Sequence, residues 1–193
     1  MSSLDLNSEH TALVAIDLQH GILARPLGPH SAADVLANSV QLANAVRAKG
    51  GLVVWVRVDL AGILHLPADA STAPPKGSPP PPANASELST ELGVQDGDVV
   101  VTKRQWGAFY GTDLEQHLRR KGIRTVIMSG IATNFGVEST ARGAFDRGYE
   151  IVFAEDAMTS LSAEAHAFVI ANIFPRMGRV RSTEEVVKAL RES

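Results

Sequence analysis

The sequence predicts an α/β fold, a single three-layer domain in which a six-stranded, mostly parallel sheet has helices on both faces. Three observations predict it. Six short β-branched runs alternate with longer segments of helical apolar spacing, most of these runs are apolar throughout, and the 193 residues suit one domain. Runs without polar alternation are typical of strands that helices cover on both sides. We therefore expect one Rossmann-like domain over residues 1–193.

The six runs are the predicted strands. In chain order they are Ala12–Asp17, Leu52–Asp59, Val99–Lys103, Thr125–Ser129, Ile151–Glu155 and Arg179–Arg181. The longer amphipathic segments between them fit the crossover helices that join parallel strands. The sheet is therefore expected to lie at the centre of the domain.

Five helices are predicted between and after these runs. The first is indicated by the apolar spacing of Val35–Val46 and is ended by a Gly-Gly pair. Two helices begin with the spacing of a capping box, Thr112 with Glu115 and Ser182 with Glu185. The remaining helices are expected over about Val137–Arg147 and Ala163–Ile173.

A Pro-rich loop is expected at about residues 60–85. This stretch holds seven of the ten prolines, including Pro79–Pro82 in a row, which excludes a regular element. Two interpretations fit it, a solvent-exposed polyproline connector and a flap beside a functional site. We favour the connector.

Composition excludes several classes of function. The chain has no cysteine, which excludes disulfides, thiolate metal sites and cysteine nucleophiles. Its net charge is -3, its cations are scattered apart from Arg119–Lys121, and its longest apolar runs, such as Leu52–Val56, are strand-sized. Residues 1–10 are polar and lack the basic and apolar regions of a secretory signal. We expect a cytoplasmic protein that binds a small molecule rather than nucleic acid or a membrane.

Charged residues close two of the predicted strands, Asp17 the first and Lys103 the third. Open parallel sheets bind ligands beyond the carboxyl ends of their strands, where a carboxylate and an ammonium can hold a substrate and move a proton. Taken alone, each residue is more often a solvated strand terminus. The segment Ser129–Thr140 runs from a strand into a helix, so its amides favour developing negative charge, although an ordinary connection also fits.

These segments together resemble the isochorismatase-like, or cysteine hydrolase, superfamily over nearly the whole chain, from about Thr11 to the last helix. The resemblance is carried by Ala15–Gln19, Lys103–Thr112, Ser129–Thr140 with the residues that follow it up to Tyr149, and Glu155–Ala157. Each motif is weak alone, but four in this order are specific. The resemblance implies the isochorismatase-like hydrolase fold and a homo-oligomer, a dimer or a tetramer.

The resemblance places Asp17 at the acid-base position, Lys103 at the lysine position and Gly136 where amide-cleaving members have their cysteine. Those members act through a thioester, and glycine offers no atom to form one, so amidase activity is not expected. True isochorismatases cleave a vinyl ether, which needs no protein nucleophile. We therefore expect a hydrolase of isochorismate-type vinyl ethers with Asp17 as general acid.

Two other interpretations of function stay open. One is an inactive family member that binds a small molecule or acts as a scaffold. The other has Asp17 activating water directly, for instance on an ester or an imine. The pKa of Asp17 is expected to fall beside the Lys103 ammonium, which favours a base. Burial and a dianionic substrate would raise that pKa again.

The resemblance also suggests residues that bind substrate. These are Gln19, Trp106, Phe109, Tyr110, Ile131, Ala132, Thr133 and Phe135. The three aromatic residues after Lys103 fit a pocket wall, a subunit contact or core packing, and the resemblance favours the wall. It further implies a cis peptide before Ala132, with the amides of Ala132 and Gly136 at the edge that binds anions.

No cofactor and no metal are expected. Zinc-type nicotinamidases of the family have an Asp, His and His cluster after the second strand, whereas this chain has Asp59 and then His65 without the first histidine. His20 is near Asp17 and could contact substrate, but a single histidine near a strand end is usually a surface residue. The chain also lacks a Gly-rich dinucleotide fingerprint, a phosphate loop and a serine nucleophile elbow.

Overall fold

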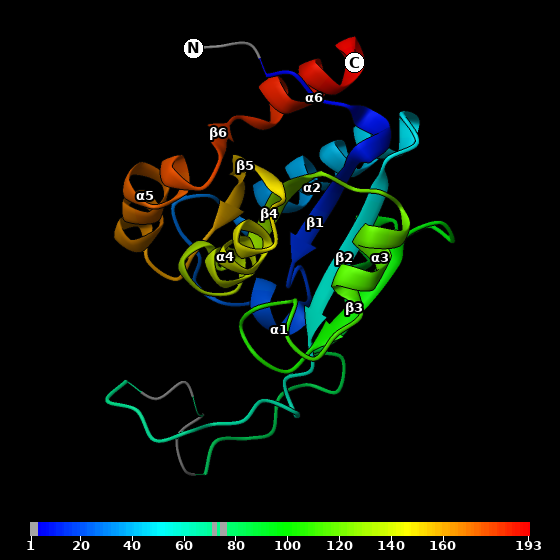
Figure 1. Cartoon of the computed structure of the whole chain (residues 1–193). Coiled ribbons are helices and arrows are strands. Elements are labelled where there is room, and N and C mark those ends of the chain that lie inside the picture. The colour runs from blue at the N-terminus through cyan, green and yellow to red at the C-terminus, as the bar shows by residue number, and fades with distance from the viewer. Residues whose placement is uncertain (1–3, 71–72, 74–76) are drawn as a thin grey trace.

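The structure, a computed structural model, describes residues 4–70, 73 and 77–193. Within this part of the chain, six strands form one sheet in the order β3-β2-β1-β4-β5-β6, and all their pairings are parallel (Figure 1). The strands are β1 (Thr11–Ile16), β2 (Leu52–Val58), β3 (Val99–Lys103), β4 (Thr125–Ile131), β5 (Glu150–Thr159) and β6 (Arg179–Arg181). The predicted Rossmann-like sheet is confirmed.

Helices cover both faces of this sheet. One face carries α2 (Ala32–Ala48) and α6 (Thr183–Glu192), and the other carries α3 (Leu114–Arg120), α4 (Glu138–Asp146) and α5 (Ala163–Asn172). The shorter elements are α1 (His20–Leu23), the 3-10 turns η1 (Ser8–His10), η2 (Thr90–Leu92) and η4 (Phe174–Arg176), and the π-helical turn η3 (Thr133–Val137). Successive strand residues face opposite layers, so each face has its own apolar core. None of the described helices has the length and apolarity to cross a membrane.

Two strands extend beyond their predicted ends. β4 continues to Ile131, and β5 continues past Glu155 to Thr159. The pairing register between β4 and β5 shifts after Met128, which is a local bulge. A bulge lets a strand continue through polar residues by turning them out of the ladder, and apolar periodicity does not reveal it.

One of the two predicted capping boxes is wrong. α3 has Asp113 at its N-cap and no side-chain cap, so Thr112 and Glu115 do not form the box. The Thr112 hydroxyl accepts instead from the Leu114 amide, two residues on, and donates to the Ala108 carbonyl. The box of Ser182 with Glu185 is present at the start of α6, where both reciprocal hydrogen bonds form.

The strand order reverses between β1 and β4, which is where open parallel sheets bind ligands. The two strands approach each other closely at their carboxyl ends because Gly130 has a φ of 110° and no side chain. A Cβ at Gly130 would lie 2.1 Å from the carbonyl oxygen of Ile16. Only glycine fits this contact, and it brings the ends of β1 and β4 together.

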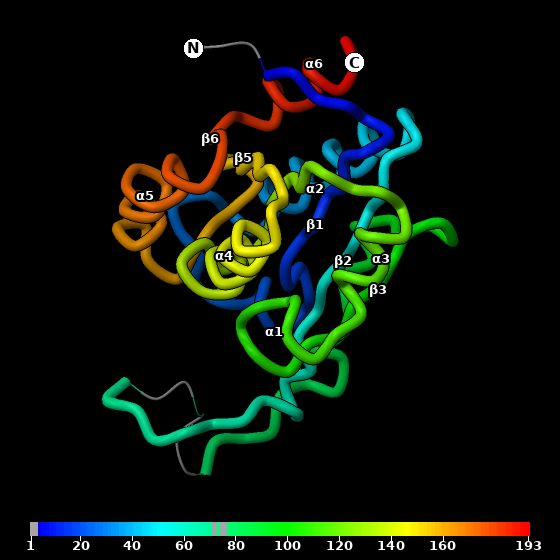
Figure 2. The backbone as a smooth tube through the Cα atoms, viewed as in Figure 1, coloured from blue at the N-terminus to red at the C-terminus, as the bar shows by residue number. Residues whose placement is uncertain are grey.

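The Pro-rich segment joins β2 to β3, and its described residues form no α-helix or strand, as predicted. In Figures 1 and 2 it extends away from the body, beyond the carboxyl ends of these strands. The buried Gln19 holds both ends of the segment. Its Nε2 donates to the carbonyls of Val58 and Ala85 at 2.9 and 3.0 Å, and its Oε1 accepts from the Val58 amide at 2.7 Å.

Candidate active site

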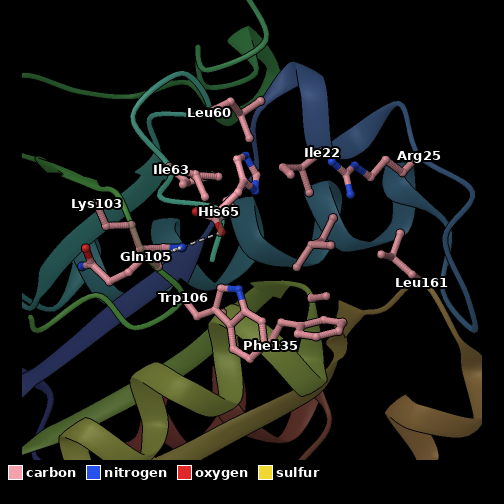
Figure 3. A pocket seen from close by; sticks show the side chains of 15 residues that line it. Ile22, Arg25, Leu60, Ile63, His65, Lys103, Gln105, Trp106, Phe135 and Leu161 are labelled. Carbon is pink, nitrogen blue, oxygen red and sulfur yellow. Dashed lines mark hydrogen bonds and ion pairs between the residues drawn. The ribbon is translucent and has the colours of Figure 1, made fainter. Parts of the chain in front are cut away.

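A cavity of about 180 Å³ opens at this reversal point, at the carboxyl ends of β1, β3 and β4 (Figure 3). Pockets for drug-sized ligands measure roughly 300–1,000 Å³, so this cavity suits a smaller molecule. Leu60, Ile63 and His65 from the Pro-rich segment line one side, and Trp106 and Phe135 line the opposite side. The lining is mainly apolar, so its few polar groups decide the chemistry.

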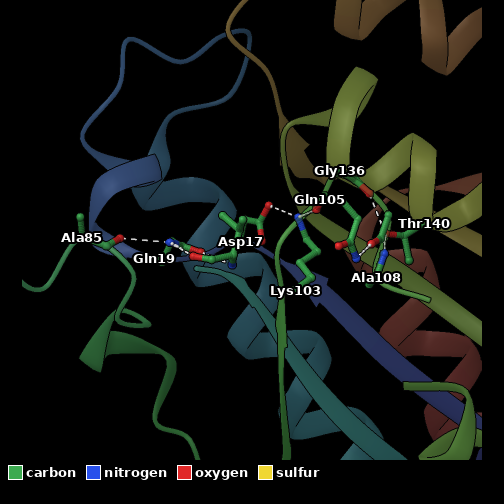
Figure 4. A network of polar contacts seen from close by, with 10 residues as sticks. Asp17, Gln19, Ala85, Lys103, Gln105, Ala108, Gly136 and Thr140 are labelled. Atoms are coloured by element: carbon green, nitrogen blue, oxygen red, sulfur yellow. Dashed lines mark hydrogen bonds and ion pairs between the residues drawn. The ribbon is translucent and has the colours of Figure 1, made fainter. Parts of the chain in front are cut away.

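Asp17 and Lys103 meet in this cavity. Lys103 Nζ lies 2.8 Å from Asp17 Oδ2 and donates a second hydrogen bond, at 3.1 Å, to the Gln105 carbonyl (Figure 4). The two side chains are only 2% and 8% exposed, for Lys103 and Asp17 respectively. The second oxygen, Asp17 Oδ1, is buried and has no hydrogen-bond partner in the described part of the chain. Such an atom is unusual in a folded protein.

Burial raises the pKa of Asp17 to about 6, and the charge and hydrogen bond of Lys103 only partly offset this rise. The sequence left open whether this pKa falls beside the ammonium or rises through burial, and in the structure it rises. The reason is desolvation, which penalises the carboxylate more than one ammonium at 2.8 Å stabilises it. A carboxyl group with this pKa exchanges its proton close to neutral pH.

Gly136 lies against the same carboxylate. A Cβ there would be 3.3 Å from Asp17 Oδ2 and 3.0 Å from Ile16 Cγ2. Gly136 lines the cavity, so a side chain there would press on Asp17 and take up part of the cavity. The Thr140 hydroxyl fixes this position, since it donates to the Gly136 carbonyl at 2.7 Å and accepts from the Ala108 amide at 3.1 Å (Figure 4).

The Ile131–Ala132 peptide is cis, as the resemblance implies. It directly precedes η3, which carries both Phe135 and Gly136 into the cavity lining. Ala132 lines the cavity as well. Anion binding by the amides of Ala132 and Gly136 stays a prediction.

Four of the eight residues predicted to bind substrate line the cavity. These are Trp106, Ile131, Ala132 and Phe135. The rings of Trp106 and Phe135 meet edge to face, with centroids 5.0 Å apart. Trp106 is nevertheless 54% exposed, so this wall borders on solvent.

The other four lie outside the cavity lining. Gln19 is fully buried, and its amide is occupied by the hydrogen bonds that hold the Pro-rich segment. Phe109 stacks on Tyr149 in the core, and Tyr110 is 80% exposed. Thr133 is buried and contacts the His166 ring. The sequence showed that these four residues belong to the motifs, but it did not show where each side chain points.

Sequence reasoning missed several lining residues. Ile22 and Arg25 come from α1 and the turn after it, and Leu161 follows β5. The Pro-rich segment adds residues 60, 63 and 65, so its start is a pocket wall, whereas its next residues, 64 and 66–70, are exposed. The sequence favoured a connector, and that interpretation does not hold for this wall. One histidine, one leucine and one isoleucine in a Pro-rich segment gave no signal of this wall.

Arg25 is the cation at the rim of the cavity, and it is exposed. Arg104, which follows Lys103 in the chain, does not line the cavity and lies 3.3 Å from Asp59 Oδ2. The cavity therefore presents one buried ion pair and one rim cation, a combination suited to an anionic small molecule.

Comparisons with known proteins agree with this arrangement. The family model described as the isochorismatase domain matches residues 11–185. The chain belongs to the isochorismatase family. It is 49% identical to the uncharacterized isochorismatase family protein YecD of Escherichia coli O157:H7 over 97% of this chain and 100% of that protein. It is 45% identical to the uncharacterized isochorismatase family protein YwoC of Bacillus subtilis (strain 168), over 99% and 100% of the two chains.

A solved structure of an isochorismatase family protein from Burkholderia thailandensis has a TM-score of 0.88 and 44% identity to this family member. The match covers 98% of this chain and 100% of that one. This likeness extends over the whole sheet and its helices. A hydrolase-family α/β domain is therefore established, and the substrate has to be argued from the cavity.

Proposed function

We propose that this isochorismatase family member hydrolyses a small carboxylated substrate without a thiol nucleophile, and that a vinyl ether of the isochorismate type fits its site best. One observation carries the proposal. Asp17 is a buried carboxyl group in the cavity lining with a pKa of about 6, and it has one oxygen on Lys103 and the other without a partner among the described residues. A proton donor in the lining of a small, mainly apolar cavity suits a reaction that begins with protonation of carbon.

The reaction needs only a proton and water. Protonated Asp17 transfers its proton to the terminal methylene carbon of the vinyl ether, and the adjacent carbon becomes an oxocarbenium ion. Water adds to that carbon and returns one proton to Asp17. The resulting hemiketal breaks its bond to the ring oxygen and yields pyruvate and the ring alcohol. General acid catalysis of this kind contributes about 10²–10⁴-fold to a rate.

Lys103 and Gly136 support this step in different ways. The ammonium holds Oδ2 of Asp17 at 2.8 Å, which leaves Oδ1 as the oxygen without a partner among the described residues. Gly136 keeps the cavity lining beside Asp17 free of a side chain, since a Cβ there would lie 3.3 Å from Asp17 Oδ2. As the chain contains no cysteine, a thioester is excluded.

Substrate charge is the second part of the proposal. Arg25 at the cavity rim offers a cation to a carboxylate, and its guanidinium has no ion-pair partner among the described residues. Arg25→Ala is expected to raise KM about 10-fold or more with kcat unchanged, because the contact is equally strong in the ground and transition states. The matched control is Arg120→Ala, an exposed arginine on α3 that does not line the cavity. Equal KM values for the two variants would remove Arg25 from the site.

The first test is pyruvate release from isochorismate by the native protein and by Asp17→Asn. We expect release by the native protein and a loss of about 10²–10⁴-fold in the variant. Full activity of the variant would refute the role of Asp17. No release by the native protein at any pH between 5 and 8 would replace vinyl ether hydrolysis by the alternative, an inactive family member that binds a small molecule.

Self-association as a dimer or a tetramer is a further part of the proposal. Four large apolar side chains are more than half exposed in the two stretches of chain that supply cavity residues 63, 65 and 106: Leu64 76%, Leu66 66%, Trp106 54% and Tyr110 80%. Apolar side chains that gather on a surface mark interaction sites. Light scattering after size exclusion tests this, and a monomer at micromolar concentration would refute it.

A further inference from the structure

Three side chains of types that bind metal ions lie close together outside the cavity. It consists of His30 in the loop before α2, Glu155 in β5 and His166 in α5. The Nε2 atoms of His30 and His166 lie 3.6 and 3.8 Å from Glu155 Oε2, and one ligand atom of each residue lies within 4.8 Å of the other two. None of the three residues lines the cavity that holds Asp17. They are 125 and 11 residues apart in sequence, so only the fold brings them together.

The protonation of His166 follows from its hydrogen bonds. Thr133 Oγ1 donates to the Thr159 carbonyl at 3.1 Å and lies 2.8 Å from His166 Nδ1. A hydroxyl has one proton, and a carbonyl can only accept, so Nδ1 of His166 carries the hydrogen that Thr133 accepts. The lone pair of the neutral ring is then on Nε2, the atom that faces Glu155. This is the arrangement that orients a metal-binding histidine, with its second nitrogen donating to a fixed oxygen.

The cluster is not satisfied by its own hydrogen bonds. A neutral His166 has no hydrogen on Nε2 to donate, and both distances to Glu155 Oε2 exceed hydrogen-bond length. Burial and the neighbouring His30 ring lower the pKa of His166, which keeps the ring neutral. A carboxylate oxygen and at least one nitrogen lone pair therefore face one another around a common point. A cation at that point would satisfy all of them.

We propose that His30, Glu155 and His166 bind a divalent transition-metal ion, with Zn²⁺ as the best match. Imidazole nitrogens and a carboxylate bind Zn²⁺ at about 2.0–2.2 Å, which separates tetrahedral ligand atoms by about 3.3–3.5 Å. The observed 3.6 and 3.8 Å therefore need to close by only a few tenths of an ångström. His166 is 5% exposed, whereas His30 and Glu155 are 31% and 39% exposed, so one side of the ion would remain open to water.

This site is distinct from the segment of Asp59 and His65 after β2, where zinc-type nicotinamidases of the family have their metal ligands. It would cross-link the loop before α2 to β5 and α5. The Thr159 hydroxyl already donates to the His30 carbonyl at 2.8 Å, so the backbone on this side is fixed before an ion arrives. Thr133, the partner of His166, is the first residue of η3, so the ion would brace the turn that carries Gly136.

The experiment uses the full chain after treatment with a chelator and gel filtration. Co²⁺ is titrated in and followed by its visible d–d absorption, and Zn²⁺ is titrated by calorimetry. We expect one ion per chain, and Kd values for Glu155→Gln and His30→Ala weakened by about 100-fold or more. His117→Ala is the matched control, because this exposed histidine also pairs with a carboxylate, Asp113, at 3.2 Å.

A second readout separates ion binding from a folding defect. Zn²⁺ should raise the melting temperature of the native chain and of the control, and leave that of Glu155→Gln and His30→Ala unchanged. Far-ultraviolet circular dichroism checks that each variant is folded. No stoichiometric binding by the native chain, or unchanged binding by the two folded variants, would overturn the proposal. Both readouts are independent of any catalytic activity.

Discussion

The pH dependence of hydrolysis tests the proposed role of Asp17 most directly. With a pKa of about 6, roughly one tenth of the molecules carry the proton at pH 7 and roughly one hundredth at pH 8. If protonated Asp17 is the acid, kcat/KM should be constant well below pH 6 and fall about tenfold for each pH unit above it. If Asp17 is a base, the same titration gives the opposite sign, and kcat/KM rises through pH 6 to a plateau.

The assay is pyruvate release at several isochorismate concentrations between pH 5 and pH 8. The profile of kcat/KM reports the free protein, and that of kcat reports the substrate complex. A dianionic substrate adds negative charge beside Asp17, so the midpoint for kcat is expected above that for kcat/KM. The control is Asp113→Asn, which removes an exposed carboxylate before α3 and should leave both midpoints unchanged.

A rate that rises through pH 6 would refute the general-acid mechanism and support a base. A flat profile over this range would refute the reasoning from burial itself, because it would mean that Asp17 does not titrate near 6 in the reacting protein. Carbon-13 NMR of the aspartate carboxyl groups gives the same pKa without substrate. A pKa of about 4 for Asp17 in that spectrum would likewise contradict the structure.

Three substitutions test the surroundings of this carboxylate. Gly136→Ala places a Cβ 3.3 Å from Asp17 Oδ2 and should lower kcat/KM about 10-fold. Gly97→Ala, whose Cβ meets nothing within 4 Å, is the control, and equal rates for the two would mean that the space is unused. Gly130→Ala puts a Cβ 2.1 Å from a backbone oxygen at a φ of 110°, so urea unfolding should show a loss of about 3 kcal/mol or more. Lys103→Met removes the ammonium that lowers the pKa of Asp17, so the pH midpoint should move above 6, and an unmoved midpoint would contradict the pairing.

The sheet could be predicted because most of its strands contain a continuous apolar run, a pattern that depends on burial alone. The end of β5 could not, because strand continuation through Glu155 depends on a bulge in its pairing with β4. The short α1 was also missed, since four residues are too few to show a helical period. Local pattern therefore predicted the elements, and pairing decided their ends.

The site was partly readable for a similar reason. Asp17 follows β1 and Lys103 ends β3, and the carboxyl ends of these parallel strands lie at the same end of the sheet, so the topology brings the two residues together. The sign of the Asp17 pKa shift depends on how completely the carboxylate is desolvated, which no spacing reveals. Arg25 and His65 reach the cavity from segments without a recognisable motif. Only the folded structure shows that these two side chains line the cavity.

The hydrogen bonds of Gln19 allow the Pro-rich segment to vary in length and composition. A single amide side chain fastens the chain where it leaves β2 and again where it returns at Ala85, so the geometry of Asp17 does not depend on the residues in between. Insertions or deletions there would change what covers the cavity and leave the Asp17 carboxylate in place. Related chains can therefore acquire new substrate preferences by changing the length and composition of this one segment, while the sheet beneath it stays constant.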